Sequence, residues 1–314
     1  EYFVYYYTHP LGGSGDETND DGEKIHVNSY TKKDGTDVKI TIGENPKDPV
    51  VGISDLLPHL ARKQMQKKGL EIIEGEDLNL TVGSIPLNGE EKDAVKANIL
   101  KLLKKKYGIE EADFLSAEIE IVPAGPARDY GLDGSMVLGY GQDDRVCAYT
   151  SLMALMEIED PERTVSCMLV DKEEVGSIGA TGMQSYFYEN VVAEIIELTG
   201  QAGGYLQLRR CLANSNMLSS DVSAAYDPNY PMVNELKNTC FFGKGITINK
   251  YVGSGGKSGS NDANPEFIAR IRKVWDDNDI TWQTAEIGKV NEGGGGTIAY
   301  IMAKYNTINF VNFL

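Results

Sequence analysis

The chain has 314 residues, a hydrophobic content of 41% and a formal net charge of −17 at pH 7. This acidic balance argues against a nucleic-acid partner, which needs a basic surface to bind phosphate, and against docking on an anionic membrane. The length and the apolar content are those of an ordinary globular protein with room for two domains, and no apolar run approaches the length of a membrane span.

The cysteine pattern bears on the compartment. The four cysteines are Cys147, Cys167, Cys211 and Cys240, and none of them forms a C-x-x-C pair. In a chain of this length the pattern indicates free thiols in a reducing compartment. No signal peptide is visible, so we expect a cytoplasmic protein.

The first third of the chain contains strand and helix patterns in mixed order. The aromatic run at residues 2–7 predicts a strand, and so does the alternation of apolar and polar residues at 36–45. Residues 56–68 and 91–107 have the spacing of amphipathic helices. We therefore predict a smaller, β-rich domain over residues 1–112.

From residue 113 onward, apolar strands alternate with helices. Strands are predicted at 117–122, 135–140, 164–170, 246–252, 280–286 and 307–313, and helices at 145–157, 182–198, 265–276 and 297–304. This alternation is typical of an α/β domain. We expect a mixed, largely parallel sheet flanked by helices over residues 113–314, with a site at the carboxyl ends of its strands.

Three acidic clusters follow predicted strands of this second domain. They are Asp143-Asp144-Arg145, Asp171-Lys-Glu-Glu-Val-Gly-Ser177 and Ser219-Ser220-Asp221. Carboxylates that converge at one edge of a sheet repel one another unless protons or cations intervene. A pair of divalent cations with one bridging carboxylate relieves this repulsion. The three clusters together therefore predict a metal centre.

Adjacent Glu173 and Glu174 suit two different tasks at such a centre. Metal-assisted hydrolysis needs ligands that leave one position open for water, and a nearby unbound carboxylate that takes the water's proton. Each cluster alone has a simpler interpretation: a helix N-cap with a surface ion pair at Asp143, a solvated pair at Glu173, and a turn residue at Asp221. The interpretation as a metal centre depends on the whole set.

Four segments, in order, carry a resemblance to a known family. They are Gly-Gln-Asp-Asp-Arg, Asp-Lys-Glu-Glu-Val-Gly-Ser, Ser-Ser-Asp-Val-Ser-Ala-Ala-Tyr-Asp-Pro-Asn and Glu-Ile-Gly-Lys-Val-Asn-Glu-Gly-Gly-Gly-Gly-Thr-Ile-Ala. Together they resemble the aspartyl-aminopeptidase-type family of dinuclear zinc aminopeptidases, over most of residues 24–304. The resemblance implies a zinc-peptidase-like α/β fold and a hydrolase that removes N-terminal residues from peptides.

The resemblance also implies individual roles. Asp143 matches the family's bridging metal ligand, Glu174 a ligand of one metal, and Asp221 a ligand of the other. Glu173 matches the general base that takes a proton from the bridging water. The implied cofactor is two divalent metal ions, with zinc expected and cobalt or manganese as alternatives.

Contacts with substrate and with other subunits are implied in the same way. Lys250 matches a lysine that contacts substrate, and Gly296 lies in the loop whose backbone amides line the family's substrate pocket. His26 matches a histidine that reaches a neighbouring active site. The smaller domain resembles the insertion that builds the family's subunit interfaces, so a homo-oligomer, up to a dodecamer, is expected.

The sequence departs from the family at two metal ligands. The chain contains only His9, His26 and His59, and none of them matches either metal-binding histidine of the family. We therefore expect that segments at the N- and C-terminal ends of the family's pattern are missing from this sequence. Two alternatives stay open: a metal-binding homologue with impaired catalysis, and another co-catalytic metallohydrolase such as a deacylase.

Overall fold

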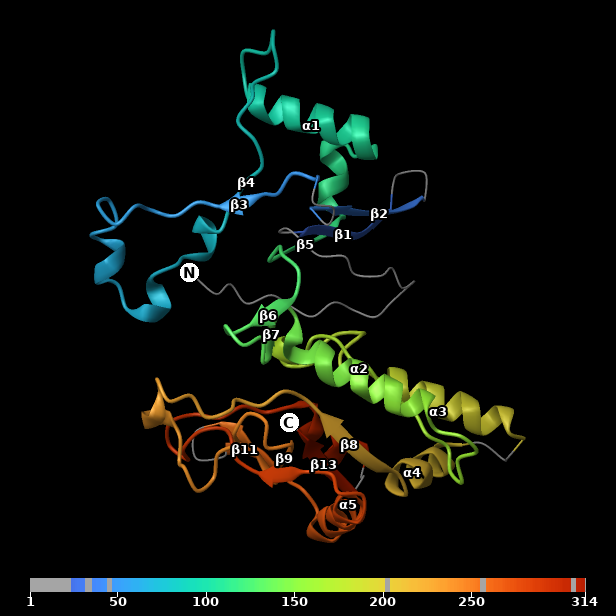
Figure 1. Ribbon diagram of the computed structural model, residues 1–314. Helices are drawn as coiled ribbons and strands as arrows, with labels where there is room; N and C mark the ends of the chain where they lie inside the picture. The colour runs from blue at the N-terminus through green and yellow to red at the C-terminus, as the bar shows by residue number, and fades with distance from the viewer. Residues whose placement is uncertain are drawn as a thin grey trace. The chain divides into compact units, whose positions relative to one another are not determined.

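The computed structural model of the protein describes residues 24–31, 36–43, 47–200, 204–254, 258–305 and 309–313 (Figure 1). The chain divides into two compact units between Tyr140 and Gly141. The boundary expected between residues 112 and 113 lies earlier than this division. The strand predicted at residues 2–7 lies outside the described residues.

The N-terminal unit is built on a small antiparallel sheet. Its strands are β1 (Lys24–Thr31), β2 (Asp37–Ile42), β3 (Gly52–Ile53), β4 (Leu80–Thr81), β5 (Glu118–Val122), β6 (Arg128–Tyr130) and β7 (Met136–Leu138), with α1 (Ala94–Tyr107) between β4 and β5. In the described part of this unit the order β2-β1-β5 forms one sheet, and β3–β4 and β6–β7 form separate antiparallel pairs. Because β5 pairs with β1, residues 113–140 stay with this unit.

A small core joins α1 to this sheet. Buried Ile40 of β2 and buried Ile109 contact partly buried Leu103 of α1. The helix ends at Gly108, which has φ = 73° and therefore adopts the left-handed conformation that suits glycine at a helix end. The helix predicted at 91–107 is thus confirmed, with a later start.

The helix predicted at 56–68 is wrong. This segment contains only the short 3₁₀ turn η1 (Gln64–Gln66), and η2 (Gly69–Glu71) and η3 (Gly75–Asp77) follow it. Pro58 lacks a backbone N–H and disfavours a helix interior. The side chains of Leu57 and Leu60 are 65% and 71% exposed, so the apolar spacing that suggested a helix is not used for packing within the described unit.

The C-terminal unit is a mixed sheet flanked by helices. Its helices are α2 (Gln142–Met156), α3 (Phe187–Leu198), α4 (Tyr205–Ala213) and α5 (Pro265–Asp277), and its strands are β8 (Asn216–Ser220), β9 (Ile246–Asn249), β10 (Tyr251–Ser254), β11 (Ser258–Asp262), β12 (Trp282–Thr284) and β13 (Asn309–Phe313). Among the described strands, the sheet order is β12-β9-β13-β8, and β10 and β11 form a separate pair. Short 3₁₀ segments complete the unit: η5 (Glu173–Val175), η6 (Pro231–Val233) and η7 (Ile298–Tyr305). The α/β fold class is confirmed.

Several details of the predicted second domain differ in the structure. The strand expected at 135–140 is β7 of the N-terminal unit, and the strand expected at 246–252 is divided between β9 and β10, which lie in separate sheets. No strand forms at residues 164–170, where Asp171 makes only an isolated parallel bridge to Gly182. Helix α4 was not predicted. The helix expected at 297–304 is the 3₁₀ segment η7.

Helix α5 shows how the sequence places an element against the sheet. Pro265 lies in its first turn, and the side chain of Asn264 accepts a hydrogen bond of 2.8 Å from the backbone N–H of Phe267. Phe267 and Trp275 are buried in one cluster with Ile248 of β9. Figure 1 shows α5 lying along this sheet.

The direction of the central strands decides where their ends lie. β8 runs parallel to β13, whereas β9 runs antiparallel to β13. The carboxyl ends of β8 and β9 therefore point toward opposite edges of the sheet. Asp221, directly after β8, and Lys250, directly after β9, continue from the sheet in opposite directions.

Candidate metal centre

The amino end of α2 supplies two carboxylates from adjacent residues. Asp143 has φ = −90° and ψ = 107°, and Asp144 has φ = −123° and ψ = 35°, so neither residue is helical. In a regular helix, side chains of adjacent residues do not face each other. With this irregular backbone, Asp143, Asp144 and Asp221 bring one carboxylate oxygen each to within 4.8 Å of one another.

Glu173 and Glu174 come to the same place from η5. Lys172 before this turn and Gly176 after it both have positive φ, 67° and 94°, and the Gly176 N–H donates 2.9 Å to the Glu173 carbonyl. The carboxyl groups of Glu174 and Asp143 are hydrogen-bonded to each other. Two segments far apart in the sequence thus join the cluster that Asp221 completes after β8.

The electrostatics of the cluster are those of crowded carboxylates. Burial, followed by the charge of Asp144, raises the pKa of Asp221 to about 7. Burial, followed by the charge of Glu174, raises the pKa of Glu173 to about 7. Burial also raises the pKa of Asp144, to about 6, and the pKa values of Asp143 and Glu174 in the same direction. Without a cation, these groups hold protons that isolated carboxylates would release.

The donor set fits a divalent cation. Oδ1 of Asp144 is buried and has no hydrogen-bond partner among the described residues. Carboxylate oxygens are among the ligands of zinc and also suit manganese, so this set does not by itself select one metal. Cys147 lies beside Asp144 and hydrogen-bonds to it, but burial first, and then that hydrogen bond, raises the thiol's pKa to about 12. The thiol is therefore neutral near pH 7 and is no competing thiolate ligand.

The structure brings together four of the residues predicted for the site: Asp143, Glu173, Glu174 and Asp221. Asp144 takes the place of Glu174 in the tightest group, and no role was predicted for it. Its position directly beside Asp143 was the available signal. The sequence did not reveal the non-helical backbone that brings Asp144 into this group.

The residues predicted to contact substrate lie in three other places. Lys250 follows β9, donates 2.9 Å to the hydroxyl of Tyr251 and lies 4.3 Å from the centre of that ring. Gly296 is an exposed residue of the 293–297 loop. His26 is part of β1 in the N-terminal unit, where its backbone is opposite Thr41 and Glu120.

The 293–297 loop is tied to two strands of its unit. The N–H of Gly253 in β10 donates 2.8 Å to the carbonyl of Gly295. A Cβ on Gly294 would lie 2.1 Å from the Gly253 carbonyl oxygen, so no larger residue fits there. The hydroxyls of Ser219, near the end of β8, and Thr297 lie 3.2 Å apart in the interior.

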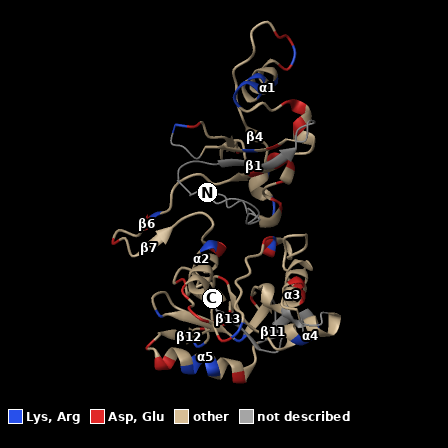
Figure 2. Cartoon of the chain, turned by 90° about the vertical axis from the view of Figure 1, so that its right-hand side faces the viewer, with Lys and Arg blue, Asp and Glu red and all other residues tan. Residues whose placement is uncertain are grey.

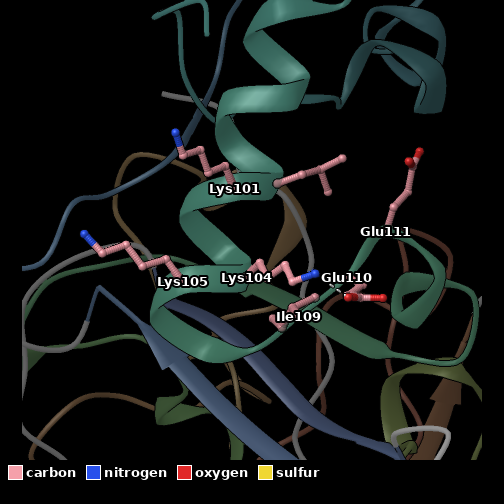
Figure 3. A pocket seen from close by; sticks show the side chains of 7 residues that line it. Lys101, Lys104, Lys105, Ile109, Glu110 and Glu111 are labelled. Atoms are coloured by element: carbon pink, nitrogen blue, oxygen red, sulfur yellow. Dashed lines mark hydrogen bonds and ion pairs between the residues drawn. The ribbon is translucent and has the colours of Figure 1, made fainter.

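A hollow in the N-terminal unit offers no comparable chemistry (Figure 3). It is lined by Leu100, Lys101, Lys104, Lys105, Ile109, Glu110 and Glu111. Lys104 forms a 2.7 Å ion pair with Glu110, whereas Lys101 and Lys105 point away from this pair. The last turn of α1 contains Lys104, Lys105 and Lys106, and Figure 2 shows basic residues on this helix in blue. None of the residues predicted for the site lines the hollow.

A family model described as aminopeptidase I zinc metalloprotease (M18) matches residues 27–311. The chain belongs to this family. A probable M18 family aminopeptidase 1 of Clostridium acetobutylicum is 62% identical over 275 residues, which are 87% of this chain and 59% of that protein. The chain thus spans about three fifths of the length of the curated relatives it matches.

Solved structures of this family agree in fold. The crystal structure of the Thermotoga maritima M18 aminopeptidase has a TM-score of 0.88 and 44% sequence identity, and covers 94% of this chain and 65% of its own. The S. cerevisiae mApe1 dodecamer has a TM-score of 0.64 at 20% identity, over 97% of this chain and 65% of that chain. This second likeness shows the fold alone.

Two further observations bear on the setting of the chain. All four cysteines are free thiols. None of the described helices combines the length and the apolar character that crossing a membrane requires.

The crowded carboxylates predict an unusual pH dependence of stability. In metal-free protein, the pKa values of Asp221 and Glu173 are raised above their ordinary values, so the folded chain binds more protons than the unfolded chain between about pH 4 and pH 7. The cluster's contribution to stability is therefore highest below about pH 4 and falls as pH rises to about 7. We expect the free energy of unfolding by urea, with a chelator present, to be about 2 kcal/mol lower at pH 8 than at pH 5.

Asp221→Asn is the matched variant for this measurement. It removes one crowded charge, so it should raise the metal-free stability at pH 8 and flatten the pH profile. A variant that is less stable than the original chain at pH 8 would contradict the assignment of Asp221 to a repulsive cluster.

Proposed function

We propose that the protein is a metal-dependent aminopeptidase, which hydrolyses N-terminal residues from peptides with two divalent ions, zinc by preference. The observation that carries this proposal is the convergence of Asp143, Asp144, Glu174 and Asp221 beside Glu173, in a chain that belongs to a zinc aminopeptidase family. We infer two ions rather than one because this set holds more carboxylates than one cation needs.

Some of the carboxylates would bind the metal ions, and another would transfer protons. Asp143 would be the ligand that the two ions share, Glu174 would bind one ion and Asp221 the other, and Asp144 would offer a further oxygen. Bound divalent ions would supply Lewis-acid activation of a water molecule and of the substrate carbonyl. Their positive charge would also offset the repulsion that raises the carboxylate pKa values in the metal-free protein.

Glu173 would serve as the general base and then as the general acid. In the metal-free protein burial is the main cause that raises its pKa to about 7, and a buried carboxyl group whose pKa lies near neutral pH can both accept and release a proton. It would take a proton from water and later deliver it to the leaving amine. The backbone amides near Gly296, together with Lys250 and with His26 of another subunit, would hold the peptide.

Hydrolysis of aminoacyl-nitroanilides, with zinc, cobalt or manganese added to chelator-treated protein, tests this proposal. We expect turnover that depends on added metal. No turnover with any of the three metals would overturn the enzyme assignment. It would favour a metal-binding homologue without catalysis, an alternative consistent with the all-carboxylate cluster in the described residues. Turnover only on N-acyl amino acids would favour a deacylase.

We also propose a homo-oligomer built through the N-terminal unit. The segment from 50 to 85 leaves Leu57, Leu60, Leu70 and Ile85 exposed, and exposed apolar side chains in such number are typical of an interface. The S. cerevisiae relative, which is a dodecamer, supports this proposal, and we expect an oligomer of at most that size. The four free thiols support a reducing, cytoplasmic setting.

Changing Leu57 and Leu60 together to Asp should reduce the oligomer to smaller species, because two charges would have to be buried at the interface. Light scattering coupled to size-exclusion chromatography measures the mass. The exposed pair Leu102 and Leu115, changed in the same way, is the control and should leave the mass unaltered. An unchanged mass for the Leu57/Leu60 variant would contradict this interface.

A further inference from the structure

The loop over residues 171–182 presents Glu173 and Glu174, and its backbone is strained. Lys172 and Ser177 both have left-handed φ values, 67° and 60°, although neither is glycine. Such a conformation costs a non-glycine residue about 1 kcal/mol or more. The surrounding contacts must therefore hold the loop in this shape.

Asp171 lies at the base of this loop and is only 2% exposed. Its backbone N–H donates 3.1 Å to the carbonyl of Thr181, and the Thr181 hydroxyl donates 3.1 Å to Oδ2 of Asp171. The ammonium of Lys172 lies 3.5 Å from the same oxygen. One buried carboxylate thus ties the first residues of the loop to its far end.

The far end of the loop is itself fixed. Met183 is buried in a core cluster with Leu208 and Leu212 of α4. A Cβ on Gly182 would lie 2.4 Å from the carbonyl oxygen of Ser177, so the two loop arms approach as closely as their backbones allow. Thr181 therefore offers Asp171 an anchored partner.

Burial of a carboxylate costs folding free energy, so the presence of Asp171 at this place indicates a specific role. Oδ1 of Asp171 is buried without a hydrogen-bond partner among the described residues. An apolar side chain at this place would avoid that cost. Side chains that hydrogen-bond to metal ligands and orient them are often buried polar groups of this kind. Their loss lowers metal affinity or activity by about 10- to 100-fold.

We propose that Asp171 is a positioning residue, which holds Glu173 and Glu174 against the cluster by fixing the 171–182 loop through Thr181 and Lys172. This inference rests on the proposed function. It adds the Asp171 carboxylate and the Thr181 hydroxyl, which lie outside the tightest carboxylate group and act through the loop.

The test compares four variants in zinc affinity, measured by competition with a chromophoric chelator. Asp171→Asn removes the charge, Thr181→Val removes the hydroxyl at constant shape, and Thr181→Ser restores it. Glu189→Gln is the control, because Glu189 is a buried carboxylate of the same unit that pairs with Arg209 on another helix. We expect Asp171→Asn and Thr181→Val to lower zinc affinity at least 10-fold, and Thr181→Ser and Glu189→Gln to stay within about twofold.

Hydrogen exchange of the peptide covering 172–182, in chelator-treated protein, gives a readout that does not need zinc. Asp171→Asn should speed exchange in this peptide at least 10-fold, and Glu189→Gln should leave it unchanged. Equal affinities for Thr181→Val and Thr181→Ser, or unchanged exchange in Asp171→Asn, would overturn the inference. If the original chain binds no zinc, the proposed function fails, and hydrogen exchange alone decides whether Asp171 holds the loop.

Discussion

Glu173→Gln is expected to lower kcat for an aminoacyl-nitroanilide by about 10³-fold in zinc-loaded protein, the middle of the range for loss of a general base or acid. The amide keeps the size of the side chain but does not take up a proton. Glu173 stands beside Glu174 and Asp143, and proton transfer by its carboxyl group is the property that the change removes. Steady-state kinetics measures the effect.

Zinc binding separates this role from that of a ligand. The zinc affinity of Glu173→Gln should stay within a few-fold of the original, because Glu173 lies outside the tightest carboxylate group. Glu197→Gln, an exposed change on α3, is the control for the loss of one glutamate charge. A Glu173→Gln protein that keeps more than about a tenth of kcat would exclude Glu173 as the base.

Asp143→Asn should lower zinc affinity by more than about 100-fold, beyond the range measured for groups that only orient ligands. Asp143 belongs to the tightest group and is also hydrogen-bonded to Glu174, so its charge would serve both ions. Isothermal titration of chelator-treated protein with zinc measures the loss. Asp276→Asn, which alters an exposed carboxylate that accepts a 2.9 Å bond from Trp282 Nε1, is the control.

The stability of Asp143→Asn provides an independent check. Burial raises the pKa of Asp143, so removal of its charge should leave the metal-free chain at least as stable at pH 8. If zinc affinity falls while the free energy of unfolding does not, Asp143 serves as a metal ligand and not as a structural residue. Weak binding that comes with loss of the fold would instead indicate a structural role.

Elements with complete local signals were predictable from the sequence. Helix α5 has a cap at Asn264, a proline in its first turn and apolar residues at helical spacing, and it forms where expected. The acidic motifs were also recognisable in the sequence, because clusters of carboxylates after predicted strands indicate a functional site and not a packed core. Their convergence was predicted from the expectation that strand ends meet at one end of a sheet. In the structure only Asp221 of these motifs follows a described strand of the main sheet, because no strand forms at 164–170 and β7 pairs with β6 in the N-terminal unit.

Tertiary arrangement decided the features that the sequence did not reveal. The apolar residues of 56–68 have helical spacing, but this spacing also occurs in segments that are not helical. Pro58 was the signal in the sequence against a helix. The antiparallel pairing of β9 with β13, which makes β8 and β9 run in opposite directions, depends on contacts between distant segments. The non-helical backbone at Asp144 has no signature in residue type.

The contact between Ser219 and Thr297 joins the strand that leads to Asp221 with the glycine-rich loop. If metal binding beside Asp221 and peptide binding at the loop are coupled through this contact, the coupling is reciprocal. If loading of the metal orders the loop and raises peptide affinity by some factor, a bound peptide raises metal affinity by the same factor. Metal loss during purification would then be slowest with a peptide inhibitor present.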